Sequence, residues 1–202
     1  PAGPPPLREP YLSTYNAAIK KRDETLKRGE LVDDASTRCL PEGMPTIMGG
    51  IYAIEFVQTA RQVIVLAEFL TQTRRIYIDE QMPPADELFP TYNGYSVAHW
   101  EGDTLVVETR GVKESVPFLS MPHSGDMVLK ERIRLTAPDR LEDHITITDP
   151  KVFATPYSFT FGYRRLDGYK IQENVCDNNR YSVDKSGEPV LDTSMQRSPA
   201  SN

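Results

Sequence analysis

Residues 126–137 have the sequence Asp-Met-Val-Leu-Lys-Glu-Arg-Ile-Arg-Leu-Thr-Ala, in which apolar and polar side chains alternate. Successive side chains of a β-strand point to opposite faces, so the row with Leu129 and Ile133 faces a core while Lys130 faces water. Glu131 belongs to the apolar row. The stretch therefore predicts a half-buried strand that directs a carboxylate inward.

Two later stretches repeat this pattern. Asp143 lies in the apolar row of residues 141–147, and Glu173 lies in that of residues 169–175. A buried carboxylate without a partner costs several kcal/mol. The three inward acids therefore predict either buried ion pairs with arginines or a polar cavity.

The same β-rich patterning predicts nine strands after a single helix at residues 11–28. The strands are expected at 51–58, 62–70, 73–79, 95–101, 103–109, 126–137, 140–149, 157–166 and 169–176. Most connections are short, which indicates antiparallel hairpins in a meander. The favoured architecture is all-β, an antiparallel meander closing into a lipocalin-like β-barrel with long Pro/Gly-rich loops; a β-sandwich is the second choice.

The 202 residues predict one main domain. Residues 1–10 are expected to form a flexible Pro-rich leader, residues 11–178 the barrel with its helix, and residues 179–202 a polar tail that is mobile from about Ser182. Two long connections, 80–94 and 110–125, interrupt the meander, and loops of that length are often functional.

The composition argues against several classes of partner and cofactor. The formal net charge is −6 and no extended basic stretch is present, so neither nucleic acid nor an anionic membrane surface is an expected partner. Membrane insertion is not expected, because no run approaches the ~20 apolar residues of a membrane-spanning helix. Phosphate-binding glycine loops, dinucleotide fingerprints, Gly-x-Ser-x-Gly elbows and paired metal-ligand motifs are missing, so we expect neither a cofactor nor a metal site.

Cys39 and Cys176 are the two cysteines. In an exported protein they would form a disulfide, and the alternative is two buried free thiols. The chain begins at Pro1 rather than Met, which fits removal of a secretory signal, or equally a trimmed segment. We expect a periplasmic or secreted protein.

Residues 99–109, His-Trp-Glu-Gly-Asp-Thr-Leu-Val-Val-Glu-Thr, resemble the central motif of an uncharacterised family of exported bacterial β-rich proteins. The likeness extends over residues 38–178 and includes the loop 38–45 and the Pro-His-Ser of residues 122–124. It implies export and a β-rich body and brings no activity with it. Tyr95 departs from the pattern, because the family has His after the preceding glycine.

Four residues are candidates for proton transfer. His123 lies in a Pro/Gly-rich loop just before the strand of Glu131, so these two form the expected acid–base pair, with Glu173 and His99 tuning them. The alternatives are structural ion pairs for the acids and an ordinary loop or strand-end position for each histidine. Parity does not decide which face of strand 95–101 points inward. His144 is expected to face solvent.

Aromatic and basic side chains complete the expected site. The residues predicted to line it are Tyr95, Trp100, Arg75, Phe161 and Tyr163. Phe161 and Tyr163 continue an aromatic row, 157–163, whose default interpretation is a core stripe, with a flat wall for an aromatic ligand as the alternative.

The leading hypothesis is a cofactor-independent acid–base enzyme of the lyase, isomerase or cyclase type, acting on a small apolar or aromatic molecule in the barrel. The competing hypothesis is a non-catalytic carrier for a small hydrophobic ligand. A structural or interaction module without a cavity is the third.

Overall fold

The computed structural model describes residues 4–30, 32–35, 37–50 and 52–176, together with the backbone of the strand pair β9 (Tyr181–Val183) and β10 (Pro189–Leu191). This strand pair falls within the predicted polar tail, and the rest of that tail beyond Cys176 lies outside the described residues. No helix in the described part of the chain is both long and apolar enough to cross a membrane.

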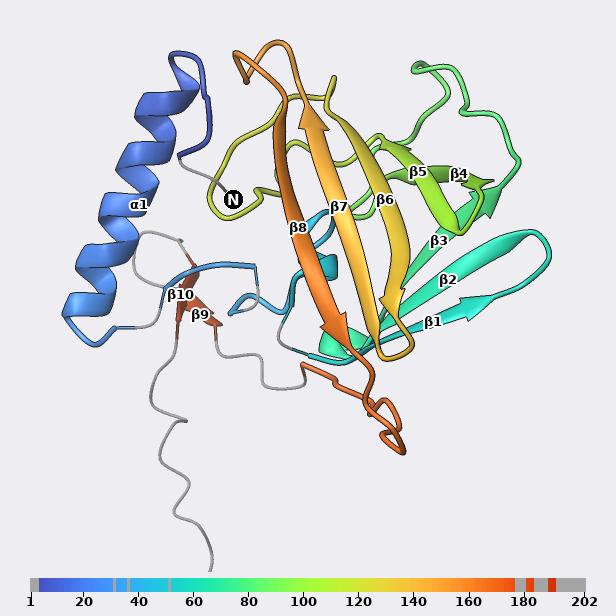
Figure 1. Ribbon diagram of the computed structural model, residues 1–202. Helices are drawn as coiled ribbons and strands as arrows, with labels where there is room; N and C mark the ends of the chain where they lie inside the picture. The colour runs from blue at the N-terminus through green and yellow to red at the C-terminus, as the bar shows by residue number, and fades with distance from the viewer. Residues whose placement is uncertain are drawn as a thin grey trace, which may run out of the picture.

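An eight-stranded sheet forms the body, with the strands in chain order from β1 to β8. It curls into a half-barrel (Figure 1), which confirms the predicted all-β meander. The strands are β1 (Ile54–Gln58), β2 (Gln62–Ala67), β3 (Gln72–Ile78), β4 (Tyr95–Glu101), β5 (Thr104–Arg110), β6 (Val128–Ala137), β7 (Arg140–Thr148) and β8 (Tyr157–Arg164).

The pairing of β3 with β4 differs from the rest of the sheet. These two strands run parallel and pair only over Ile76–Ile78 and Ser96–Ala98, whereas every other neighbouring pair in the sheet is antiparallel. The long connection 79–94 allows this parallel pairing, because it carries the chain back from the end of β3 to the level of Ile76, where β4 begins to pair. None of the described strands therefore pairs with the first half of β3, Gln72–Arg75, on the β4 side.

The ninth predicted strand, 169–176, does not form. Side-chain contacts hold this segment instead. Glu68 accepts hydrogen bonds from the Tyr169 hydroxyl at 2.7 Å and from the Gln172 backbone N–H at 3.0 Å. Asn174 accepts from the backbone N–H of Leu70 at 3.1 Å. The alternation of residues 169–176 therefore belongs to an irregular segment fastened to the turn before β3, and not to a ladder.

The core lies on the concave face of the sheet and follows the predicted parity. Val65, Val107, Leu129 and Ile145 are fully buried on four different strands. Along β8 the aromatic row turns inward, and the rings of neighbouring members lie 5.9 Å and 5.2 Å apart from Tyr157 through Phe159 to Phe161. This confirms the reading of the row as a core stripe.

The helix α1 (Tyr11–Lys27) lies on the β8 side of the sheet (Figure 1) and packs Tyr11, Leu12 and Tyr15 against the core. The described part of the Pro-rich leader, residues 4–10, is attached to the body through Leu7 and its neighbours. Leu7 is buried and bridges to Phe153, and the neighbouring backbone groups bond to residues 152–154. Burial of Leu7 supplies the apolar contact that a flexible leader would lack.

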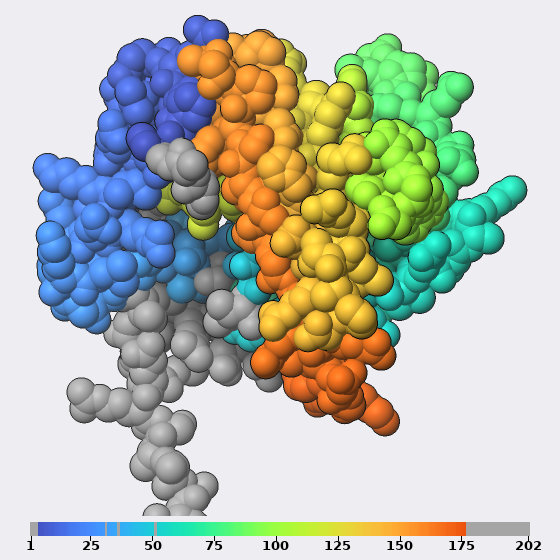
Figure 2. All heavy atoms as spheres, in the orientation of Figure 1, coloured from blue at the N-terminus to red at the C-terminus, as the bar shows by residue number. Residues whose placement is uncertain are grey.

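Cys39 and Cys176 form a disulfide, which confirms the first of the two cysteine hypotheses. It joins the loop after α1 to the irregular segment after β8. A disulfide is typical of proteins that fold outside the reducing cytoplasm. Figure 2 shows the connection 79–94, the β4–β5 hairpin and the β1–β2 hairpin next to one another along one flank of the body.

Candidate functional site

Arg74 and Glu131 form a buried ion pair on the concave face. The Arg74 Nη1 atom lies 2.8 Å from Glu131 Oε1, and Nη2 contacts Oε2, so the pair is bidentate. The Ser96 hydroxyl at 3.2 Å and the Thr109 hydroxyl at 3.0 Å accept further hydrogen bonds from Nη2. Burial alone would lower the pKa of Arg74, but the charge and hydrogen bonds of Glu131 raise it. Glu131 is inward as predicted, with a cation as its partner.

Asp143 adds a second acid to this one cation. It is fully buried, as parity predicts, and neither of its oxygens has a hydrogen-bonding partner in the described structure. Burial raises the pKa of Asp143 well above its ordinary value, the nearby charge of Glu131 raises it further, and Arg74 opposes both effects. Burial and the neighbouring carboxylate therefore both favour the neutral, protonated form of Asp143.

Tyr163 closes the cluster on the β8 side. Its hydroxyl donates to the carbonyl of Met48 at 2.7 Å, which fixes the loop before β1 against the sheet. Burial, together with the charges of Asp143 and Glu131, raises the pKa of Tyr163. The hydroxyl is thus a structural donor and not an acid at physiological pH.

His123 is buried away from Glu131. Its Nδ1 lies 3.0 Å from the carbonyl of Ser124, and its Nε2 lies 2.9 Å from the carbonyl of Val116. Both ring nitrogens therefore face backbone carbonyls within the connection of residues 111–127. The expected proton-transfer pair is not assembled here, and the catalytic roles of both residues stay predictions.

His99 and Trp100 lie on the β4–β5 hairpin and are exposed. His99 contacts Glu101 at 3.2 Å, and Glu101 in turn pairs with Arg132 at 2.9 Å. These contacts lie on the solvent side of the sheet, which places Ser96 and Ala98 on the inner face of β4. His99 therefore does not meet Glu131. His144 is exposed as predicted and contacts the Thr160 hydroxyl at 3.0 Å.

Glu173 is also exposed, contrary to the prediction that it points inward. The parity argument required a strand at residues 169–176, and the chain is irregular there. Glu173 therefore does not join Glu131 and Asp143.

A pocket of about 520 Å³ opens where β3 and β4 separate. Three segments form it: the first part of β3 with the turn before it, the end of the connection before β4, and Pro41 from the disulfide-bonded loop. Its lining residues are Pro41, Leu70, Thr71, Gln72, Thr73, Arg74, Arg75, Tyr77, Thr91, Tyr92, Asn93, Gly94 and Tyr95. The volume lies within the roughly 300–1,000 Å³ that is usual for small-molecule sites.

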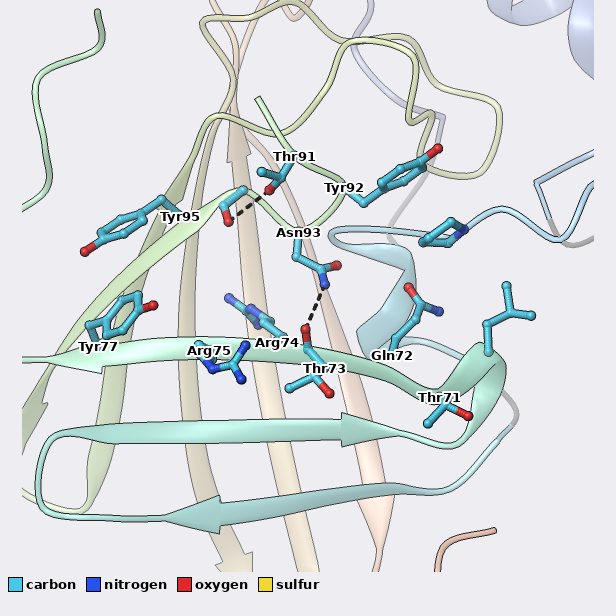
Figure 3. A pocket seen from close by; sticks show the side chains of 13 residues that line it. Thr71, Gln72, Thr73, Arg74, Arg75, Tyr77, Thr91, Tyr92, Asn93 and Tyr95 are labelled. Atoms are coloured by element: carbon cyan, nitrogen blue, oxygen red, sulfur yellow. Dashed lines mark hydrogen bonds between the residues drawn. The ribbon is translucent and has the colours of Figure 1, made fainter. Parts of the chain in front are cut away.

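Figure 3 shows the rings of Tyr77 and Tyr95 at one end of the pocket and Tyr92 toward the other end. The rings of Tyr77 and Tyr95 are stacked, with centroids 5.1 Å apart and planes inclined by 24°. The Tyr95 hydroxyl donates to Glu80 at 3.1 Å, and this hydrogen bond holds the ring in place. Burial, followed by this bond, raises the pKa of Tyr95. The pocket therefore presents flat aromatic surface that carries no charge of its own.

Asn93 and Gly94 connect the pocket walls. Asn93 Nδ2 donates to the carbonyl of Thr73 at 3.3 Å, across the gap between the strands (Figure 3). Gly94 has φ +67, and a Cβ atom there would lie 2.5 Å from the carbonyl oxygen of Arg110. Only glycine fits this close, left-handed position, so it sets the turn that directs Asn93 toward β3.

Of the predicted lining residues, the structure brings Tyr95 and Arg75 together in this pocket. Phe161 and Tyr163 belong to the core row, and Trp100 is 42% exposed on the hairpin. Sequence reasoning missed Gln72, Thr73, Asn93 and the other members of the wall. The length of the 80–94 connection was the available signal, because its last residues supply one side of the pocket.

In the part of the chain that the structure describes, no group of three or more His, Cys, Asp or Glu side chains could hold a metal ion. No family model matches the chain, and no curated protein matches it significantly.

Proposed function

We propose that this protein binds a small molecule in the pocket between β3 and β4 and does not transform it. One observation carries the proposal: a cavity of about 520 Å³ lined by stacked tyrosines, two arginines and the side-chain amides of Gln72 and Asn93. Ligand sites commonly combine aromatic surface with a few fixed polar groups.

Contacts within the protein already hold the polar groups of the pocket wall in place. Asn93 is fixed by Thr73 and Tyr95 by Glu80, and the disulfide anchors the loop that carries Pro41. A preorganised wall reduces the conformational entropy lost on binding. This supports a binding role.

The acid–base alternative has less support from the geometry. Glu131 is paired with Arg74, Asp143 is fully buried, and both nitrogens of His123 contact backbone carbonyls. A general acid or base must come within hydrogen-bonding reach of its substrate. Glu131 and Asp143 instead lie in the interior of the sheet, and His123 packs within the connection between β5 and β6.

We also infer that the protein acts outside the cytoplasm, in the periplasm or as a secreted protein. The disulfide supports this, as does the resemblance of residues 38–178 to exported proteins. The proposed ligand would then be a compound of the periplasm or the extracellular medium.

The test uses a small-molecule extract of the source cells. The protein is incubated with the extract, separated by gel filtration, and its bound compounds are identified by mass spectrometry. Thr73→Trp fills the pocket from its exposed rim, and Thr160→Trp places the same change on the outer face of β8. We expect the parent and Thr160→Trp to retain a compound that Thr73→Trp does not retain.

Two results would overturn the proposal. Equal retention by all three proteins, or by none, would contradict a ligand site in this pocket. A compound whose mass changes in the presence of the parent protein would make it an enzyme.

A further inference from the structure

The lining of the pocket is basic in an acidic protein. The chain carries a formal net charge of −6, yet the lining contains two arginines and no Asp or Glu. Arg74 is neutralised by Glu131. Arg75 is exposed and makes no ion pair or side-chain hydrogen bond with any residue that the structure describes.

Arg75 differs in this respect from most arginines on the sheet. Besides Arg74, four others have acidic partners: Arg110 with Glu108, Arg132 with Glu101, Arg134 with Glu142 and Arg140 with Asp139. At the aromatic end of the pocket, the Tyr95 hydroxyl donates a hydrogen bond to the carboxylate of Glu80, which is not itself a lining residue. An anionic group on a ligand is therefore favoured at Arg75 and disfavoured next to Tyr95.

The backbone of β3 adds donors at the same place. The Asp79 N–H bonds to the carbonyl of Ala98, and the Thr73 carbonyl accepts from Asn93, so odd-numbered residues direct their backbone groups toward the β4 side. The N–H groups of Thr73 and Arg75 accordingly point toward the gap, where β4 does not yet run beside β3. Backbone N–H groups and a guanidinium together suit a carboxylate.

The other end of the pocket suits an uncharged aromatic group and not an anion. Tyr77 and Tyr95 offer a stacked aromatic wall, and Figure 3 shows Arg75 between this wall and Asn93. A planar ring can stack on the tyrosines while an attached carboxylate reaches Arg75. We infer that the ligand is a small aromatic carboxylate, with its ring on Tyr77 and Tyr95 and its anionic group at Arg75. This inference rests on the proposed binding function.

The experiment compares two probes of nearly equal shape, 2-naphthoate and its neutral carboxamide. Titration calorimetry gives the Kd of each probe for the parent protein, for Arg75→Gln and for Arg164→Gln, the last being an exposed arginine on the outer face of β8. We expect the parent to bind the carboxylate at least about tenfold more tightly than the amide. Arg75→Gln should remove this preference and leave the affinity for the amide unchanged, while Arg164→Gln should retain it.

Each other outcome overturns one part of the account. If carboxylate and amide bind equally and Arg75→Gln has no effect, while Thr73→Trp abolishes both, the ligand class is wrong and the binding function stands. If neither probe binds, the ligand class is overturned, and retention from the cell extract decides the proposed function separately.

Discussion

Arg74 on β3 and Glu131 on β6 form a bidentate ion pair with side chains that are 1% and 0% exposed. The pair joins strands that are three positions apart in the sheet order, so it links the two sides of the half-barrel across its interior. The pair also holds β3 in place, and β3 is the strand from which Thr73 and Arg75 line the pocket. The interior ion pair therefore supports one wall of the proposed binding site.

Glu131→Gln should destabilise the protein, because it removes the bidentate anionic partner of the buried Arg74 guanidinium. Removing one partner of a buried pair costs about 3–5 kcal/mol. Urea unfolding followed by tryptophan fluorescence measures the change. Glu142→Gln is the matched control, since Glu142 lies 3.9 Å from exposed Arg134 and should lose less than about 1 kcal/mol. Equal effects of the two substitutions would contradict the structural role of Glu131.

Asp143→Asn should stabilise the protein increasingly as the pH rises. The folded state raises the pKa of Asp143, mainly through burial, whereas the unfolded carboxyl titrates near about 3.9. The folded state then binds more protons than the unfolded state above pH ~4, so its stability falls as the pH rises toward the folded pKa. Asparagine does not titrate and escapes this loss. Denaturant midpoints from pH 4 to 8 provide the test, and a difference from the parent that is independent of pH would refute it.

His123→Ala should destabilise the connection of residues 111–127 between β5 and β6. Two backbone carbonyls, those of Val116 and Ser124, lose their contacts with the imidazole, and leaving a buried acceptor unsatisfied costs about 1–3 kcal/mol. His144→Ala removes an exposed histidine and should change stability by less than about 0.5 kcal/mol. Thermal unfolding of both variants gives the comparison. A His123→Ala protein as stable as the His144→Ala protein would show that the ring does not hold the loop.

Reduction of the disulfide should weaken both the fold and the pocket. Cys39 lies two residues before Pro41 on the rim, and Cys176 lies two residues after Asn174, which hydrogen-bonds to Leu70 and Thr71. The double substitution to serine removes a cross-link between positions 137 apart, which the chain-entropy estimate puts at about 4–5 kcal/mol. Affinity for 2-naphthoate, measured where both proteins are folded, should also fall. Unchanged affinity would mean that the disulfide does not position the rim.

Parity within single strands predicted the burial of Glu131 and Asp143 because alternation is a local property of the chain. The same rule failed at Glu173, where an apolar–polar alternation occurs in a segment held by Glu68 and the disulfide. A sequence pattern reports which face a residue would take in a strand, and tertiary contacts decide whether that strand forms.

The pocket could be predicted only in part. Tyr95 and Arg75 were candidates, and the length of the 80–94 connection indicated a functional loop. The cavity itself depends on the parallel pairing of β3 with β4 beginning at Ile76 and Ser96, which is a register between distant segments. The short hairpins elsewhere favoured an antiparallel meander throughout, so the place where the two strands separate had no local signal.

The most direct test of the account is a backbone-amide NMR titration of the protein with a compound that it retains from the cell extract. A ligand in the pocket should shift the amides of Thr73, Arg75, Asn93 and Tyr95, and Thr73→Trp should abolish these shifts. Shifts confined to the concave face around Glu131, or none at all, would contradict a binding site between β3 and β4.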